Sequence, residues 1–261
     1  MLSMSWLDPV RAALDARTAP TAVFVRDDDA GWGHDRLAAL VAAAASHGVM
    51  IDLAVIPDAL DGPVAADLVR WAHAGHVRVH QHGRSHANHE QVGRKSEFGP
   101  GRSRHDQQLD LLDGAGRLSA ELGSLVDPVF TPPWNRCTAV TAELLAELGW
   151  RGLSRDHTAE PFGRSDLAEI PVTFDWFGKT RGQPWDPAQR AERLAASLAD
   201  GDSATGIMLH HAVTDRDNLA AIGQLLALLA AHPMVWLTPL ADLASSRPST
   251  PGRNGGFRPG S

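Results

Sequence analysis

The chain has 261 residues, of which 43% are hydrophobic and 21% charged, and this balance excludes a disordered, collagen-like or coiled-coil protein. Acidic residues outnumber basic ones by 31 to 24, so the formal net charge is -7 and a nucleic-acid partner is not expected. The single cysteine, Cys137, can form neither an internal disulfide nor a cysteine-rich zinc site.

Neither a signal peptide at the N-terminus nor a membrane span is expected from the sequence. The first residues lack the basic stretch and apolar run of a signal peptide, and the most apolar window, 37–56, is interrupted by His47, Gly48 and Asp52. We therefore expect a cytoplasmic protein without a membrane partner, and the sequence leaves its oligomeric state open. Residues 1–245 are predicted to form one domain. The Pro/Gly/Ser/Arg-rich segment 246–261 is predicted to be a disordered tail.

Apolar runs of strand length alternate with helical periods along the chain. A helix is expected first, at 7–16, with Asp8 as its N-cap and Pro9 at its first position. The expected strands are 22–26, 49–56, 76–80, 128–131, 151–153, 169–173, 206–210 and 234–237. The expected helices between them are 35–46, 63–73, 106–122, 138–148, 187–198 and 219–231. This alternation predicts an α/β protein with parallel strands, either a barrel of seven or eight βα units or an open doubly wound sheet. No Gly-x-Gly-x-x-Gly follows a strand, which gives nucleotide binding little support.

The long polar segment 90–104 has no period of its own and is predicted to be a surface loop. Loops of this length often act as lids or binding loops, although a mobile connection fits the sequence as well.

Polar clusters follow several of the expected strands, at the end where α/β folds place their sites. The first strand leads directly into Asp27, Asp28 and Asp29, and three adjacent carboxylates suit a metal ligand together with a general base. A solvated loop with a helix cap would explain them equally well.

The third strand leads into four histidines within ten residues, of which His82 and His86 are four apart. On a turn this spacing directs both imidazoles at one point, so a metal site is favoured over a structural role. Asp28, His82 and His86 would then be three protein ligands that leave positions for water and substrate.

The fourth and seventh strands end in two further candidates. The turn Thr131-Pro-Pro133-Trp134-Asn135 is stiffened by its prolines and presents the Trp134 amide, which could stabilise an oxyanion or simply end a strand. The strand at 206–210 ends in His210 and His211, one of which should face the mouth of the barrel as a general acid or a hydrogen-bonding group.

Taken in order, these motifs resemble those of the polysaccharide deacetylase superfamily, the metal-dependent enzymes related to carbohydrate esterase family 4, which have a distorted, incomplete (β/α)7-8 barrel. The family's Thr-Phe-Asp-Asp-Gly is similar to the segment 25–29, which implies Asp27 as catalytic base and Asp28 as metal ligand. Its His-Ser/Thr-x-x-His resembles the segment from His82 to His86 and implies the other two ligands.

The later motifs of the family resemble this chain less closely. The family's Arg-x-Pro-Tyr-Gly is similar to the segment 131–135, which implies an oxyanion amide on Trp134 between Pro133 and Asn135. Its Leu-x-His resembles the segment 208–210 and implies His210 as general acid. Its Asp-Trp motif resembles Asp175-Trp176 only loosely. The resemblance extends over about residues 21–240, but only the short motifs are specific.

Three departures mark a divergent member. Thr131 stands where the family has the arginine that tunes the base, so an equivalent contact comes from elsewhere or is absent. Asp29 replaces the motif glycine and could be the metal ligand in a shifted register, and His211 could replace His210.

The resemblance implies a hydrolase that removes an acyl group, acetyl above all, from a carbohydrate-like or other N-acylated small molecule. It also implies one divalent metal, with zinc expected and Co, Ni, Mn or Fe as alternatives. Trp32, Trp134 and Trp176 could stack on sugar rings, although ordinary core or rim positions explain tryptophans as well. Two other functions stay open: a non-catalytic carbohydrate- or partner-binding barrel, and a metal phosphoesterase, for which Asp27-x-Asp29 at a strand end is the argument.

Overall fold

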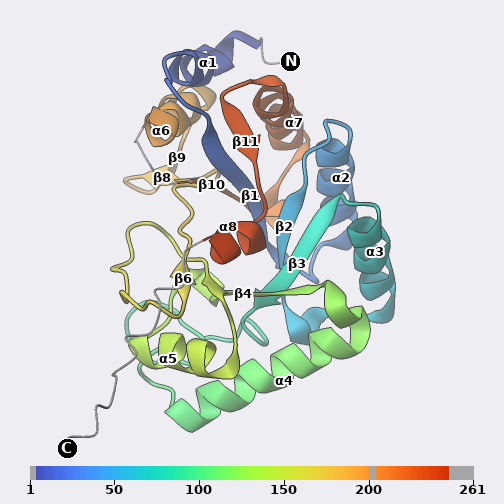
Figure 1. Cartoon of the computed structure of the whole chain (residues 1–261), viewed down its shortest axis with the longest axis vertical. Coiled ribbons are helices and arrows are strands. Elements are labelled where there is room, and N and C mark those ends of the chain that lie inside the picture. The colour runs from blue at the N-terminus through green and yellow to red at the C-terminus, as the bar shows by residue number, and fades with distance from the viewer. Residues whose placement is uncertain (1–3, 200–203, 247–261) are drawn as a thin grey trace, which may run out of the picture.

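The computed structural model describes residues 4–199 and 204–246, and its main feature is a curled sheet of parallel strands (Figure 1). The strand order is β6-β5-β4-β3-β2-β1-β10-β7, and β11 pairs with the first residues of β1. The strands of this sheet are β1 (Thr21–Ala30), β2 (Ile51–Val55), β3 (Val77–His82), β4 (Val126–Thr131), β5 (Gly152–Leu153), β6 (Ala168–Glu169), β7 (Phe174–Asp175), β10 (Thr205–Leu209) and β11 (Val235–Leu237). The two ends of this order, β6 and β7, do not pair with each other among the described residues, so the barrel is incomplete. The expected fold class, an incomplete α/β barrel, is confirmed.

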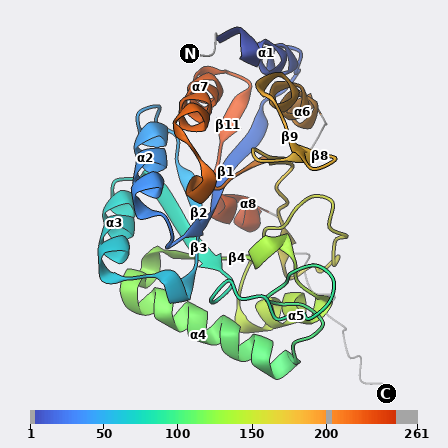
Figure 2. The ribbon, with the colours of Figure 1, turned by 180° about the vertical axis from the view of Figure 1, so that it is seen from behind.

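Eight α-helices of the described chain accompany the sheet: α1 (Asp8–Asp15), α2 (His34–Ala45), α3 (Gly62–His73), α4 (Arg104–Leu122), α5 (Ala139–Leu148), α6 (Pro187–Ala199), α7 (Arg216–Ala231) and α8 (Leu240–Ser246). Figures 1 and 2 show α1 and α6 at one end of the molecule and α4 and α5 at the other. Several helices begin at a side chain that accepts a hydrogen bond from the first turn, among them Asp61 before α3, Ser103 before α4, Asp186 before α6 and Asp215 before α7.

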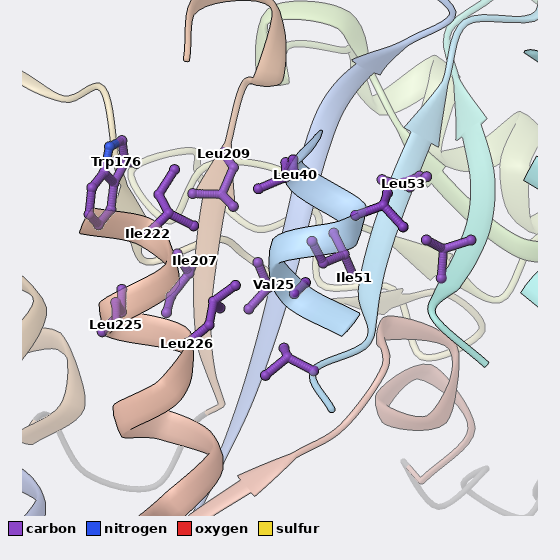
Figure 3. Packing of buried hydrophobic residues seen from close by; sticks show 14 of the residues in the cluster. Val25, Leu40, Ile51, Leu53, Trp176, Ile207, Leu209, Ile222, Leu225 and Leu226 are labelled. Atoms are coloured by element: carbon purple, nitrogen blue, oxygen red, sulfur yellow. The ribbon is translucent and has the colours of Figure 1, made fainter. Parts of the chain in front are cut away.

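The main hydrophobic core lies between the outer face of the sheet and the helices that cover it. Val25 of β1 and Ile207 of β10 pack with Leu225 and Leu226 of α7, beside Leu40 of α2 (Figure 3). This contact buries alternate residues of each strand, as the period of a β-strand requires. The opposite residues of β1 therefore point into the barrel.

A second hydrophobic cluster fills the lower part of the barrel. Phe24 of β1, Val129 of β4 and Met208 of β10 pack there with Leu240 and Ala241 of α8. Helix α8 contacts β4 and β5 and covers this part of the concave side (Figure 1). The buried carboxyl group of Asp52 accepts from the Leu240 N–H at this end, and the Asp and His clusters lie at the other end of the interior, at the carboxyl ends of the strands.

The structure differs from the sequence prediction in several local features. Asp8 is the first residue of α1 rather than its cap, and Leu7 occupies the cap position. The sequence pattern did not predict α8 or the hairpin of β8 (Lys179–Thr180) and β9 (Gln183–Pro184), because these are short elements without a clear period. The expected strand 169–173 is reduced to β6, and β7 follows separately. Of the predicted tail, residues 247–261 lie outside the described residues.

No helix within residues 4–199 and 204–246 is both long and apolar enough to cross a membrane.

Candidate metal centre and its surroundings

Strand β1 extends to Ala30, so all three aspartates of the sequence cluster belong to it. Side chains alternate between the two faces of a strand, and Arg26 and Asp28 share the face that points into the barrel. Asp27 points the other way. The pairing with β2 shifts register between Asp27 and Ala30, and Asp29 has a left-handed φ of 70°, so the regular alternation ends there.

Three of the expected residues form a potential metal site: Asp29, His82 and His86. One ligand atom from each lies within 4.8 Å of the others, and this is the one such group of three or more His, Cys, Asp or Glu residues that the described part of the chain contains. Asp29 Oδ1 is 3.3 Å from Nε2 of His82 and 3.3 Å from Nε2 of His86. This oxygen is buried and has no hydrogen-bond partner among the described residues. A buried carboxylate oxygen that faces two imidazole nitrogens fits a divalent cation of the zinc type.

The two histidines are held in different ways. His82 is buried at the end of β3, and its Nδ1 lies 2.9 Å from the Thr131 carbonyl oxygen, which accepts the Nδ1 proton and leaves Nε2 free to coordinate. His86 lies on the following loop with a φ of 58°. Its ring contacts the indoles of Trp32 and Trp134, at centroid distances of 5.2 and 4.3 Å.

The remaining histidines of the cluster are not part of this group. His80 is buried, and its Nε2 lies 2.8 Å from Thr131 Oγ1. Burial and the nearby Arg26 guanidinium lower the pKa of His80 to about 3, so it is neutral. His89 lies near Arg102, with 3.5 Å between its Nε2 and Nη1 of the arginine.

Asp28, the aspartate expected as a ligand, forms a buried ion pair with Arg26. Nε and Nη2 of Arg26 donate to Oδ1 and Oδ2 of Asp28 at 2.8 and 3.0 Å. Burial alone would raise the pKa of Asp28, but the Arg26 guanidinium and two nearby histidines outweigh it and lower the pKa to about 2. Asp28 is therefore ionised across the ordinary pH range, and its oxygens are outside the three-ligand group.

Arg26 uses all five of its N–H donors inside the barrel. Besides the two bonds to Asp28, its Nη1 donates to the carbonyl and the hydroxyl of Ser154, at 3.2 and 2.8 Å. Its Nη2 also donates to Asn135 Oδ1 at 2.7 Å. Arg26 thus supplies Asp28 with a cationic partner from the same strand, whereas Thr131 of β4 provides none. From the sequence, Arg26 could have been identified by its position two residues before Asp28, because residues two apart in a strand point to the same face.

Asp27, the expected base, and His211, the alternate acid, form a second buried pair away from this group. His211 donates its backbone N–H to Asp27 Oδ1 at 2.9 Å, and its Nδ1 lies 2.5 Å from Asp27 Oδ2. Nε2 of His211 lies 2.6 Å from the Trp32 carbonyl oxygen. Both ring nitrogens thus face acceptors, and although burial lowers the pKa of His211, the Asp27 carboxylate raises it overall. The geometry describes a charged histidine that joins β1, β10 and the segment around Trp32.

His210, the expected general acid, is half-buried at the carboxyl end of β10. Its Nε2 lies 4.0 Å from Asp28 Oδ2, and its ring lies 6.4 Å from that of Phe177. Burial raises the pKa of Asp175, although the nearby His210 partly opposes this shift. His210 is thus the histidine of the adjacent pair that faces Asp28.

The turn after β4 brings its residues to the same site. Trp134 and Asn135 both have left-handed φ angles, 56° and 57°, a conformation that non-glycine residues adopt at a cost and that often occurs at functional sites. Asn135 N–H donates to the Pro132 carbonyl, and its side chain accepts from Arg26. Pro133 is buried beneath the turn.

Two of the expected tryptophans lie at the site, and one does not. Trp32 is 42% exposed and Trp134 is partly exposed, so each can present a ring to a bound molecule. Trp176 is only 1% exposed, and its Nε1 donates to Asn218 Oδ1 at 2.9 Å. Its place in the core, with Asn218 of α7 at its edge and the Arg190 guanidinium of α6 over its ring, leaves it no face for a substrate.

Comparisons with known proteins agree with this architecture. No protein-family profile matches the sequence, and no curated protein does. Among solved structures, the chain is similar to a protein from Mycobacterium smegmatis that is named as a polysaccharide deacetylase. The TM-score is 0.68 at 20% identity, over 88% of this chain and 91% of the other.

Two further solved structures extend the comparison. A family 4 acetyl xylan esterase from Clostridium thermocellum, in complex with a cobalt ion, has a TM-score of 0.58 at 15% identity, over 86% of this chain and 90% of that one. A family 4 pseudoenzyme from Bacillus anthracis has a TM-score of 0.51 at 14% identity, over 80% and 62% of the two chains. The chain therefore has the fold of the polysaccharide deacetylases and family 4 carbohydrate esterases.

Proposed function

We propose that the protein is a metal-dependent hydrolase that removes an acyl group, acetyl in the first instance, from the nitrogen of a carbohydrate-like substrate. The observation that carries this proposal is the buried Oδ1 of Asp29, which has no hydrogen-bond partner among the described residues and lies 3.3 Å from Nε2 of both His82 and His86. The fold and the acetyl xylan esterase with its cobalt ion support the same class of chemistry.

Asp29, His82 and His86 would hold the cation in this proposal, so the ligand register is shifted by one residue from that of the family motif. One carboxylate and two imidazoles suit zinc, and also cobalt, nickel, manganese or iron. A divalent cation there supplies Lewis acidity to the acyl carbonyl and to water.

The same shift assigns the general base to Asp28 rather than to Asp27. Asp28 is adjacent to the ligand Asp29, is ionised because of Arg26, and has an oxygen 4.0 Å from His210 Nε2. Both oxygens of Asp27 are engaged by His211, on the other face of β1. Asp28 accepts the proton of the attacking water, and Arg26 keeps its carboxylate in one orientation.

Trp134 and His210 act on the carbonyl oxygen and on the leaving nitrogen, respectively. The Trp134 amide, held in the strained turn between Pro133 and Asn135, donates to the oxygen that becomes negative during the attack. His210, half-buried beside Asp28, donates a proton to the departing nitrogen. Trp32 and Trp134 offer apolar faces for a sugar ring next to the acyl group.

The test is acetate release from N-acetylglucosamine oligomers by metal-loaded wild type, beside a His82→Ala, His86→Ala double variant. The proposal expects about one equivalent of a transition metal in the wild type, little in the variant, and acetate release only from the former. An aryl phosphate serves as the control substrate. Phosphate release from it, without acetate release, would support the phosphoesterase. Metal without turnover of any acyl substrate would support a non-catalytic barrel, for which the family 4 pseudoenzyme is a structural precedent.

A further inference from the structure

Glu97 lies in the long polar loop between β3 and α4 and is almost completely buried, at 1% exposure. A buried carboxylate needs partners, and the described residues provide no arginine, lysine or histidine that forms an ion pair with it. Its partners lie instead in the turn that carries His86. The segment expected from the sequence to be a surface loop thus has a buried centre at residues 96–99.

Glu97 accepts three hydrogen bonds from two consecutive residues of that turn. Oε1 accepts from the Ser85 backbone N–H at 2.8 Å and from Ser85 Oγ at 3.0 Å, and Oε2 accepts from the Arg84 backbone N–H at 3.3 Å. Backbone donors that point at one carboxylate fix the path of the chain at residues 84 and 85. His86 is the next residue.

Gly83 shows how closely Glu97 approaches this turn. Gly83 has a φ of 59°, and a Cβ atom there would lie 2.1 Å from Glu97 Oε2 and 2.6 Å from Pro133 Cγ. Only glycine leaves room for the carboxylate beside the backbone. The turn after β3, Glu97 and the turn after β4 are therefore packed against one another.

Glu97 itself is fixed by the chain on both sides. Ser96 N–H donates to Asn88 Oδ1 at 3.0 Å, and Ser96 Oγ donates to the Arg136 carbonyl at 3.3 Å. Thr138 N–H donates to the Phe98 carbonyl at 3.2 Å. These contacts join the Glu97 segment to the residues that follow Trp134, so the backbone on both sides of the carboxylate is fixed.

His86 depends on this arrangement more than His82 does. His82 belongs to a central strand, and the Thr131 carbonyl orients its ring. The His86 ring has aromatic neighbours but no hydrogen bond to another described residue, and its backbone is left-handed. Its direction is determined by the turn that precedes it, because no outer hydrogen bond orients the imidazole itself.

We infer that Glu97 is a positioning residue for the metal centre, which acts through the Arg84 and Ser85 amides to direct the His86 imidazole at the cation. The inference rests on the metal site of the proposed function. It assigns to the long loop a structural part in cation binding, where the sequence suggested a lid or a mobile connection.

The test is the affinity of metal-free protein for Co²⁺, measured against a competing chelator, together with the visible absorption of the Co²⁺ form. Glu97→Gln keeps the side-chain volume, but its amide nitrogen cannot accept a hydrogen bond, so at least one backbone donor loses its acceptor. We expect Co²⁺ affinity to fall about 10-fold to 100-fold, as for other residues that orient a ligand, with an altered absorption band. The matched control is Glu90→Gln in the same loop, whose carboxylate accepts from Gly101 N–H at 2.9 Å, and its affinity should be that of wild type.

A purely structural role is distinguished by the melting temperatures of the metal-free proteins. If Glu97→Gln lowers the melting temperature but retains wild-type Co²⁺ affinity and absorption, the inference is wrong. Should this variant fail to fold, Glu97→Asp keeps the negative charge but shortens the side chain, which withdraws the carboxylate from the Arg84 and Ser85 amides. It should weaken Co²⁺ binding in the same direction by a smaller factor, and unchanged affinity would overturn the inference.

Acetate release by wild type is measured separately, because it tests the proposed function alone. A wild type that binds Co²⁺ with an affinity sensitive to Glu97, but releases no acetate, contradicts the proposed function and supports the inference. Turnover with an affinity that is insensitive to Glu97 contradicts only the inference. A wild type that binds no metal contradicts both.

Discussion

Arg26 and Asp28 face each other inside the barrel from adjacent same-face positions of β1, with Nε to Oδ1 at 2.8 Å and Nη2 to Oδ2 at 3.0 Å. Both side chains are buried, at 0% and 3% exposure. A bidentate pair of this kind orients the carboxylate and keeps it ionised. The two residues thus form this pair from a single strand.

Removing one partner of this pair should be costly. Arg26→Met leaves the Asp28 charge buried without its counter-ion, and we expect a loss of about 3–5 kcal/mol in the free energy of unfolding, measured by urea denaturation. The double variant Arg26→Met, Asp28→Asn removes the unpaired charge and should recover part of that loss. Costs that simply add in the double variant would show that the pair is not energetically coupled.

The three consecutive aspartates should separate into three roles when each is changed to asparagine. Asp29→Asn should lose metal and turnover together, because it removes the anionic ligand. Asp28→Asn should retain metal and lose turnover by a factor of roughly 10² or more, because it removes the base. Asp27→Asn should retain metal and lower the melting temperature, because it removes the partner of the buried His211. Metal content by elemental analysis, acetate release and thermal unfolding measure these outcomes, and loss of metal in Asp28→Asn alone would restore the unshifted register.

The role of His210 can be tested with two leaving groups. An amine must be protonated as it departs, whereas 4-nitrophenolate leaves readily without a proton. We therefore expect His210→Ala to slow acetate release from an N-acetyl sugar by about 10²-fold to 10⁴-fold, and release from 4-nitrophenyl acetate far less. An equal effect on both substrates would contradict a general-acid role.

Asp52 of β2 should make the protein less stable as the pH rises. Burial raises the pKa of Asp52 to about 8, against an ordinary 3.8, although the Leu240 N–H donates to its carboxyl group. Between these pH values the unfolded chain releases this proton and the folded chain retains it. The stabilising contribution of Asp52 to the free energy of unfolding is therefore complete below about pH 4 and is lost progressively up to about pH 8.

Asp52→Asn removes the ionisable carboxyl group but keeps a side-chain oxygen that can accept a hydrogen bond from the Leu240 N–H. Its melting temperature should vary less with pH than that of wild type and should exceed it by roughly 5 °C at pH 9. Glu121→Gln, an exposed site, is the matched control and should follow the wild-type curve. Parallel curves for Asp52→Asn and wild type would show that Asp52 titrates normally in the folded protein.

The sequence alone determined the order of strands and helices, because buried strands and amphipathic helices leave different periods in the chain. It also placed the aspartate and histidine clusters correctly at the carboxyl ends of β1, β3 and β10, because each cluster directly follows an apolar run. The short elements, β8, β9 and α8, have too few residues to show a period. Their positions depend on contacts with distant parts of the chain.

Only the tertiary structure decided which aspartate faces the two histidines. Three identical side chains in a row carry no sequence signal for their direction, which the alternation of β1 and the left-handed φ of Asp29 determine together. The partners of Arg26 at Ser154 and Asn135, and those of Glu97 at Arg84 and Ser85, are likewise brought together by the closure of the sheet and the packing of its loops. The local sequence pattern specifies which secondary structure each segment forms. The direction of a side chain within a site depends on its contacts with residues that are distant in the sequence.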